Sequence, residues 1–179
     1  TSTPPIPPTP ARTFGSMSVV GGSLGWPAHD SPDVNLSWRS FAPTNAYLGL
    51  VNYNGDTDTQ APQMAGIFSP PRLPAFVAAH QVYDWNWGCN PPQGCRGGLL
   101  TWPYAVTLLE LGSTPGEPLA IASRIPSVAG DYKAMVLYAE ESRLTVTYTH
   151  DDSPVNGYLL HFEDVAVAPE LVALYRQLD

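Results

Sequence analysis

Lys133–Thr149 reads KAMVLYAEESRLTVTYT and holds two strand-like runs, the second rich in β-branched residues, separated by a short acidic connection. In the second run, Arg143–Thr149, apolar and polar residues alternate strictly, which is typical of a strand with one face buried. The connection, Ala139–Ser142, is short enough to join two neighbouring antiparallel strands. This stretch therefore predicts a β-hairpin made of Lys133–Tyr138 and Arg143–Thr149.

The chain from Phe14 onward shows the same kind of signal, with short apolar runs bounded by Gly, Pro, Asn and Asp. Such boundaries are typical of strands joined by turns. The further runs that predict strands are Met17–Val20, Tyr47–Tyr53, Phe76–Tyr83, Ala105–Leu111 and Tyr158–Phe162. We therefore expect an all-β fold, an antiparallel sandwich or rolled sheet, in a single domain over residues 14–179.

The two ends of the chain differ from this pattern. Residues 1–13, TSTPPIPPTPART, are rich in Pro and Thr and predict an extended arm or linker. This arm could act as a spacer, pack on a neighbouring subunit or stay solvated. At the other end, Pro169 and Glu170 suit the first turn of a short C-terminal helix, which would pack on the sheet or on a partner. Its apolar face repeats every three or four residues, at Leu171, Leu174, Tyr175 and Leu178.

Composition limits the possible partners. The formal net charge is -8 and the arginines are scattered singly, so the chain lacks the basic patch that nucleic acids and anionic lipids require. No apolar run approaches the roughly 18 residues of a membrane-spanning helix. The 20 prolines, 15 glycines and 13% charged residues are typical of an exported β-rich protein. We expect a secreted or cell-surface location, with no nucleic-acid partner.

A second informative stretch, Tyr83–Gly98, holds both cysteines and two of the five tryptophans. Only five residues separate Cys89 from Cys95, and the prolines and glycine among them can turn the backbone, so the spacing predicts a disulfide-closed loop. The alternatives are two free thiols or a metal site, although no histidine or third cysteine lies nearby to complete a zinc ligand set. A disulfide would indicate an oxidising exterior.

Tyr83, Trp85 and Trp87 occupy alternate positions, with Asp84 and Asn86 between them. In a strand the three rings share one face. Such a row can stack on sugar rings, while neighbouring polar side chains bind the hydroxyl groups. The same row could instead be the buried face of a sheet, because each tryptophan buries roughly 150–250 Å², or a protein interface. These three aromatic residues are the candidate binding residues, and glycan or cell-wall polymer is the candidate ligand.

Two histidine motifs suggest a different chemistry. His29 and Asp33 have His-x3-Asp spacing, and His161 stands in a strand ending His-Phe-Glu. These motifs resemble the lysostaphin-type zinc metallopeptidases, which cut peptidoglycan cross-bridges and use a His-x3-Asp pair and a His-x-His segment followed by Phe-Glu. The resemblance implies zinc on His29, Asp33 and His161. Leu159 stands where that family has the first histidine of His-x-His, the usual general base, so the implied site is active or degenerate.

One more segment could hold a cation. Asn54, Asp56 and Asp58 stand at alternate positions and could aim their oxygens at calcium, although a plain polar turn explains the same residues. Neither HExxH nor a glycine-rich phosphate-binding loop occurs. The sequence therefore favours a noncatalytic β-domain that binds glycan or assembles with copies of itself into a filament or surface layer. The alternative is a lysostaphin-like peptidase acting on peptidoglycan.

Overall fold

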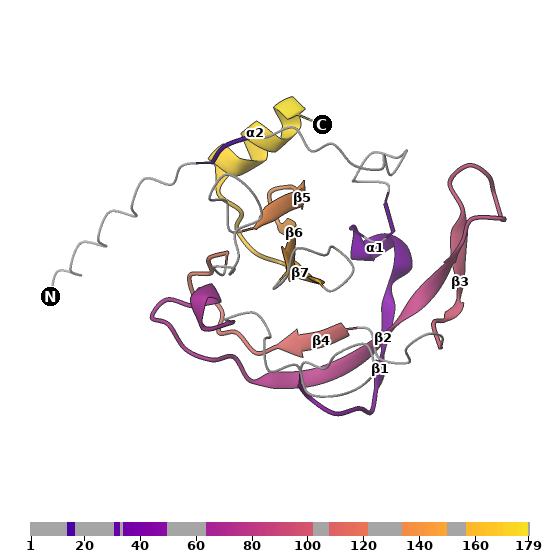
Figure 1. Cartoon of the computed structure of the whole chain (residues 1–179), viewed down its shortest axis with the longest axis horizontal. Coiled ribbons are helices and arrows are strands. Elements are labelled where there is room, and N and C mark those ends of the chain that lie inside the picture. The colour runs from indigo at the N-terminus through magenta and orange to yellow at the C-terminus, as the bar shows by residue number, and fades with distance from the viewer. Residues whose placement is uncertain are drawn as a thin grey trace, which may run out of the picture.

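The structure, a computed structural model, describes residues 14–16, 31–32, 34–49, 64–101, 108–121, 134–149 and 157–178. Within these ranges the chain forms two antiparallel sheets, one of four strands and one of three, with few helical residues. This confirms the predicted all-β class. In the view of Figure 1, the three-stranded sheet lies between the C-terminal helix α2 (Pro169–Leu178) and the larger sheet.

The larger sheet is built around one long strand, β2. Its strands are β1 (Phe41–Thr44), β2 (Phe76–Asn86), β3 (Cys95–Leu99) and β4 (Leu108–Leu111). Ala79 and His80 of β2 have partners in both β1 and β4, so these two strands lie on opposite edges of β2. β3 pairs only with the end of β2, from Tyr83 to Asn86. This hairpin projects beyond the rest of the sheet, at the right of Figure 1.

The three-stranded sheet contains the hairpin that the sequence predicts most clearly. Its strands are β5 (Met135–Ala139), β6 (Arg143–Thr149) and β7 (Gly157–Glu163), in that order across the sheet. β6 has the predicted bounds and pairs with β7 along its whole length. β7 extends the predicted Tyr158–Phe162 by one residue at each end, and β5 occupies most of the predicted Lys133–Tyr138.

Two strands of the larger sheet also match predicted runs. β2 begins at Phe76, as predicted, and continues beyond the predicted end to Asn86. β4 begins at Leu108, inside the predicted run Ala105–Leu111. The sequence pattern does not predict β1, β3 or the four-residue helix α1 (Leu36–Arg39), which precedes β1.

Other expectations fall wholly or partly on residues outside the described ranges. The structure describes neither Met17–Val20 nor the Pro-rich arm, residues 1–13. Of the predicted strand Tyr47–Tyr53 it describes residues 47–49, which are not part of a strand and end in a bend at Gly49. The extended arm and the strand Met17–Val20 therefore stay predictions.

The hydrophobic core lies against one face of the three-stranded sheet and reaches the 3-10 helix η2 (Met64–Ile67). Its buried side chains are Ile67, Phe68, Val146 and Leu160, and partly buried Leu111, Leu119, Ile121, Ala134, Val136, Leu144 and Phe162 pack around them. Alternation along β6 places Leu144 and Val146 in this core. Arg143 and Thr145 therefore face the opposite side of the sheet.

The C-terminal helix α2 begins at Pro169, as predicted, and packs on β5. The rings of Tyr138 and Tyr175 meet edge to face at 6.1 Å, and the Tyr175 hydroxyl donates to the Leu137 carbonyl at 3.3 Å. Burial is the main cause that raises the pKa of Tyr138 to about 12. Of the two expected arrangements for this helix, the structure has the one in which it packs on the sheet. Neither helix in the described part of the chain is long and apolar enough to cross a membrane.

Candidate functional site

The predicted disulfide is present between Cys89 and Cys95, whose Cα atoms lie 5.8 Å apart. It closes the turn between β2 and β3, where Cys95 also pairs with Asn86 in the ladder. Asn86 shapes the turn further, because its side-chain oxygen accepts from the Gly88 amide at 2.9 Å. Closing so small a loop stabilises the fold by about 2 kcal/mol in the chain-entropy model. The disulfide thus holds the hairpin end in one conformation.

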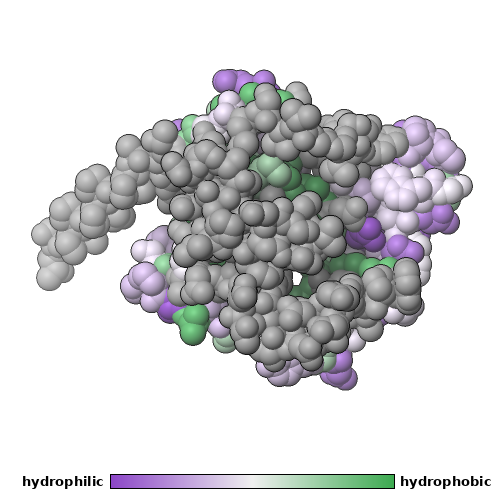
Figure 2. All heavy atoms as spheres, in the orientation of Figure 1, coloured by the Kyte–Doolittle hydropathy of each residue, from purple (hydrophilic) through white to green (hydrophobic). Residues whose placement is uncertain are grey.

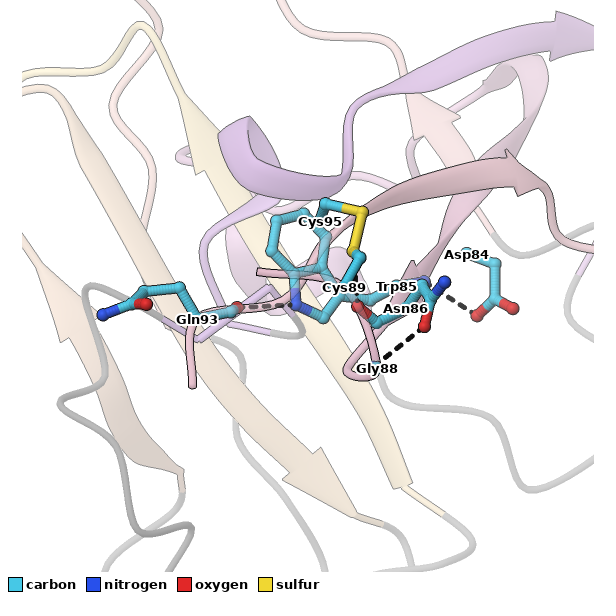
Figure 3. Close-up of a disulfide and its surroundings, with 7 residues drawn as sticks. All are labelled: Asp84, Trp85, Asn86, Gly88, Cys89, Gln93 and Cys95. Atoms are coloured by element: carbon cyan, nitrogen blue, oxygen red, sulfur yellow. Dashed lines mark hydrogen bonds between the residues drawn. A yellow bond between two sulfur atoms is a disulfide. The ribbon is translucent and has the colours of Figure 1, made fainter. Parts of the chain in front are cut away.

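Trp85 lies buried at the base of this loop, with 8% of its surface exposed. Its indole Nε1 donates to the Gln93 carbonyl at 3.1 Å, and its backbone amide donates to the Asp84 carboxylate at 2.8 Å (Figure 3). Gly94 has φ 79°, and a Cβ at this position would meet the Trp85 indole. The loop can therefore close over the ring only because a glycine stands there.

Trp85 contacts two further tryptophans, one on each side in the sequence. Its ring meets Trp38 at 6.0 Å with an interplanar angle of 85°, and Trp87 at 6.3 Å with an angle of 71°. Trp38 is 40% exposed and Trp87 is 46% exposed. We call Trp38, Trp85 and Trp87 the tryptophan cluster: one buried ring that supports two half-exposed ones.

The cluster differs from the row of rings expected along one strand. β2 ends at Asn86, so Trp87 lies in the turn that follows. The ladder between β2 and β3 also has a register shift between Tyr83 and Trp85. The extra residue lies on β3, between Arg96 and Leu99, and a bulge of this kind increases the local twist of the hairpin. Tyr83 is half-buried, and its ring lies 5.9 Å from the Arg96 guanidinium.

The half-exposed Trp38 comes from α1, whose first turn is capped by Asn35. The Asn35 side-chain oxygen accepts from the Ser37 amide at 3.2 Å and from the Ser37 hydroxyl at 2.6 Å. At the other end of the helix, Arg96 of β3 donates to the Trp38 carbonyl at 3.0 and 3.2 Å and to the Ser37 carbonyl at 3.3 Å. Arg39 reaches the other strand of the hairpin and donates to the Tyr83 carbonyl at 3.1 Å. These bonds fix Trp38 against the hairpin.

Sequence patterns do not identify Trp38 or Arg96 as site residues, because nothing local links them to Trp85. The available signal is indirect: Asn35 followed by Leu-Ser-Trp-Arg is an N-cap followed by a possible helical turn. That signal predicts a helix start but does not predict what the helix packs against.

Of the predicted zinc ligands, the structure describes His161 on β7, whereas His29 and Asp33 lie outside the described residues. His161 Nδ1 lies 3.1 Å from the Thr145 hydroxyl oxygen, and that hydroxyl donates to the Val34 carbonyl at 2.8 Å. Because the hydroxyl has one hydrogen and gives it to Val34, Nδ1 must be the donor to Thr145. The lone pair of the neutral ring is therefore on Nε2. Burial lowers the pKa of His161 to about 4.

No group of three or more His, Cys, Asp or Glu side chains that could hold a metal ion occurs among the described residues. The possible calcium ligands Asn54, Asp56 and Asp58 lie outside those ranges, as does His29. The zinc and calcium sites therefore stay predictions.

The other described histidine, His80 on β2, is not a predicted site residue. Its Nε2 lies 3.0 Å from Glu110 of β4, its ring meets Phe41 edge to face at 5.0 Å, and its buried Nδ1 has no hydrogen-bond partner. In the tautomer with hydrogen on Nε2, this nitrogen donates a hydrogen bond to Glu110. Nδ1 then has a lone pair and not an unpaired N–H group. This arrangement joins β2 to β4.

Comparison with known proteins identifies no relative: no protein-family model, curated protein or solved structure matches the chain. The candidate site therefore rests on its own geometry. It consists of the tryptophan cluster, the disulfide that closes the hairpin, and the bonds from Arg39 and Arg96 that hold α1 in place.

Proposed function

We propose that this chain is a noncatalytic domain, secreted or displayed at a cell surface, that binds glycan or cell-wall material through the tryptophan cluster. The observation that carries the proposal is that Trp38 and Trp87 are half-exposed although both contact the buried Trp85. Indole rings left at a surface are typical of recognition sites, because each offers a large apolar face and an N–H group.

The support beneath these rings favours binding. The Cys89–Cys95 disulfide, the Asn35 cap and the Arg96 bonds all restrain the segments that carry Trp38 and Trp87. A surface held in place before binding loses less conformational entropy when a ligand arrives. The disulfide is also compatible with an extracellular location, where such bonds persist.

We expect Trp38→Ala and Trp87→Ala each to weaken retention on polysaccharide at least about tenfold, which corresponds to about 1.4 kcal/mol of binding free energy. The measurement is affinity electrophoresis and pull-down on soluble glucans, xylan, chitin and peptidoglycan sacculi, with the melting temperature recorded for each variant. Leu73→Ala is the matched control, because Leu73 is an apolar residue that is 76% exposed and lies outside the cluster.

Retention that survives both tryptophan substitutions would exclude the cluster as the binding site. If the chain instead forms an oligomer that Trp38→Ala or Trp87→Ala dissociates, the cluster binds a second copy, as in the self-assembly hypothesis. Sizing each variant by light scattering separates that outcome from glycan binding.

A second candidate function, zinc-dependent peptidoglycan hydrolysis, is favoured by one observation. The chain of hydrogen bonds from His161 through Thr145 to Val34 holds His161 beside a residue that follows Asp33 directly in the sequence. His161 Nε2 and Asp33, with His29, would then hold the ion, and zinc would activate a water molecule for attack on a peptide bond. Leu159, at the position of the family's general base, is 42% exposed.

The zinc hypothesis predicts about one zinc per chain in protein purified without chelator, by elemental mass spectrometry. His161→Asn should lose the metal, because asparagine can replace Nδ1–H as the donor to Thr145 but has no group at the position of Nε2. His80→Asn is the control and should keep it. A wild-type protein with well under one equivalent of zinc would contradict the hypothesis.

A further inference from the structure

The charges around the tryptophan cluster indicate which class of glycan it can accept. This step rests on the proposed function. Among the described residues, two cationic side chains contact the segments that carry the cluster, Arg39 of α1 and Arg96 of β3. Recognition of an anionic sugar would need at least one of them to present paired N–H groups to a carboxylate, sulfate or phosphate.

Arg96 has no such pair to offer. Its Nε and one terminal nitrogen, Nη2, donate to the carbonyls of Trp38 and Ser37. Both edges of the guanidinium that can bind an anion in a bidentate manner include Nη2. Neither edge is therefore left with both of its N–H groups unengaged. Arg96 acts on the site by holding Trp38.

Arg39 is largely shielded from solvent. Its Nη1 donates to the Tyr83 carbonyl at 3.1 Å and lies 3.8 Å from the Asp84 carboxylate, and its side chain is only 16% exposed. The Asp84 side chain of the same pair is 60% exposed. In this ion pair the Asp84 carboxylate therefore faces solvent, and the Arg39 guanidinium is mostly buried.

Three other polar side chains of the hairpin, Asp84, Asn86 and Gln93, are acceptors or amides. Oδ1 of Asp84 accepts a hydrogen bond from the Trp85 backbone amide. The side chains of Asn86 and Gln93 are exposed on the hairpin. In Figure 2 the hairpin end, at the right, is white to purple, so its visible surface is polar or near neutral in hydropathy. Such a surface suits hydroxyl groups, which donate to carboxylates and amides.

We infer that the cluster binds an uncharged polysaccharide, whose sugar rings stack on Trp38 and Trp87. An anionic polymer would approach a hairpin whose Asp84 carboxylate is exposed, within a chain whose formal net charge is -8. Like charges repel, so acidic glycans are disfavoured.

The test compares neutral polymers (glucan, xylan, chitin) with anionic ones (polygalacturonate, alginate, heparin) at salt concentrations from about 50 to 500 mM. We expect retention on a neutral polymer with no change across that salt range. Asp84→Asn should leave it unchanged, because Asp84 lies on the face of β2 opposite Trp85. Asparagine can still accept from the Trp85 amide, so the hairpin should stay folded, which the melting temperature checks.

Glu110→Gln is the control, since it removes the same charge from β4, which pairs with the other end of β2. Binding to an anionic polymer that weakens with salt and strengthens in Asp84→Asn would overturn the inference while keeping the cluster as a glycan site. If no polysaccharide of either class is retained, or if Trp38→Ala and Trp87→Ala change nothing, the proposed function fails and this inference fails with it.

Discussion

Replacing Trp85 by alanine is expected to lower the free energy of unfolding by about 3–5 kcal/mol, the usual cost of removing a buried tryptophan. The ring is almost fully buried, its N–H bonds to the Gln93 carbonyl, and it touches both Trp38 and Trp87. Its loss would leave a cavity between α1 and the hairpin and an unpaired carbonyl at Gln93. Chemical denaturation under non-reducing conditions measures the difference.

Trp87→Ala provides the matched control, because it removes the same side chain from the same hairpin at a half-exposed position. It removes the edge-to-face contact with Trp85, and we expect a loss of about 1 kcal/mol. The two variants should therefore differ by at least about 2 kcal/mol. Equal losses would mean that Trp85 does not support the cluster, and the distinction between a structural ring and two binding rings would be wrong.

The three-stranded sheet was predictable because its signal is local. Along Arg143–Thr149 every second side chain is apolar, and Leu144 and Val146 are in the core as that alternation requires. The turn between β5 and β6 is short, so pairing follows from adjacency in the chain. Register with β7 then follows from matching the buried faces of the two strands.

The larger sheet was less predictable, because two of its strands, β1 and β3, lack a strand pattern in the sequence. β1 contains Pro43, which cannot donate to a ladder and weakens any strand prediction, yet it is tolerated here because β1 is an edge strand. β3 contains two glycines, Gly97 and Gly98. Glycine has no side chain, so these positions show no alternation of apolar and polar residues. Both strands form because β2 offers them an edge. β3 follows β2 in a hairpin, whereas the partner of β1 lies far away in the sequence.

The candidate site also has one part that the sequence predicts and one part that it does not predict. The Cys89–Cys95 disulfide follows from spacing and is confirmed. The arrangement of the rings does not follow from spacing, because β2 ends at Asn86 before Trp87, and because a bulge in β3 opposite Tyr83 and Trp85 twists the hairpin. Trp38 reaches Trp85 only through the antiparallel pairing of β1 with β2, which returns the chain to the hairpin.

Acid should destabilise the fold by about 3 kcal/mol through His161 alone. Burial lowers the pKa of this residue from 6.5 to about 4, so between these values the unfolded chain binds a proton that the folded chain does not. The free energy of unfolding therefore falls as the pH is lowered from about 6.5 toward 4, and above 6.5 this contribution does not change. Denaturation at pH 7 and pH 4 measures the difference, with a chelator present so that the ring titrates without metal.

His161→Asn isolates this contribution, because asparagine keeps an N–H donor for the Thr145 hydroxyl but takes up no proton in this range. Other groups also titrate, and Glu163 acts in the opposite direction: burial raises its pKa, so its protonation favours the folded state as the pH falls. Glu163 is present in both proteins, so its effect cancels in the comparison. We expect the wild type to lose about 3 kcal/mol more than His161→Asn between pH 7 and pH 4. Parallel curves would show that His161 is accessible to solvent protons in the folded state, and the assignment of a buried ring donating from Nδ1 would be wrong.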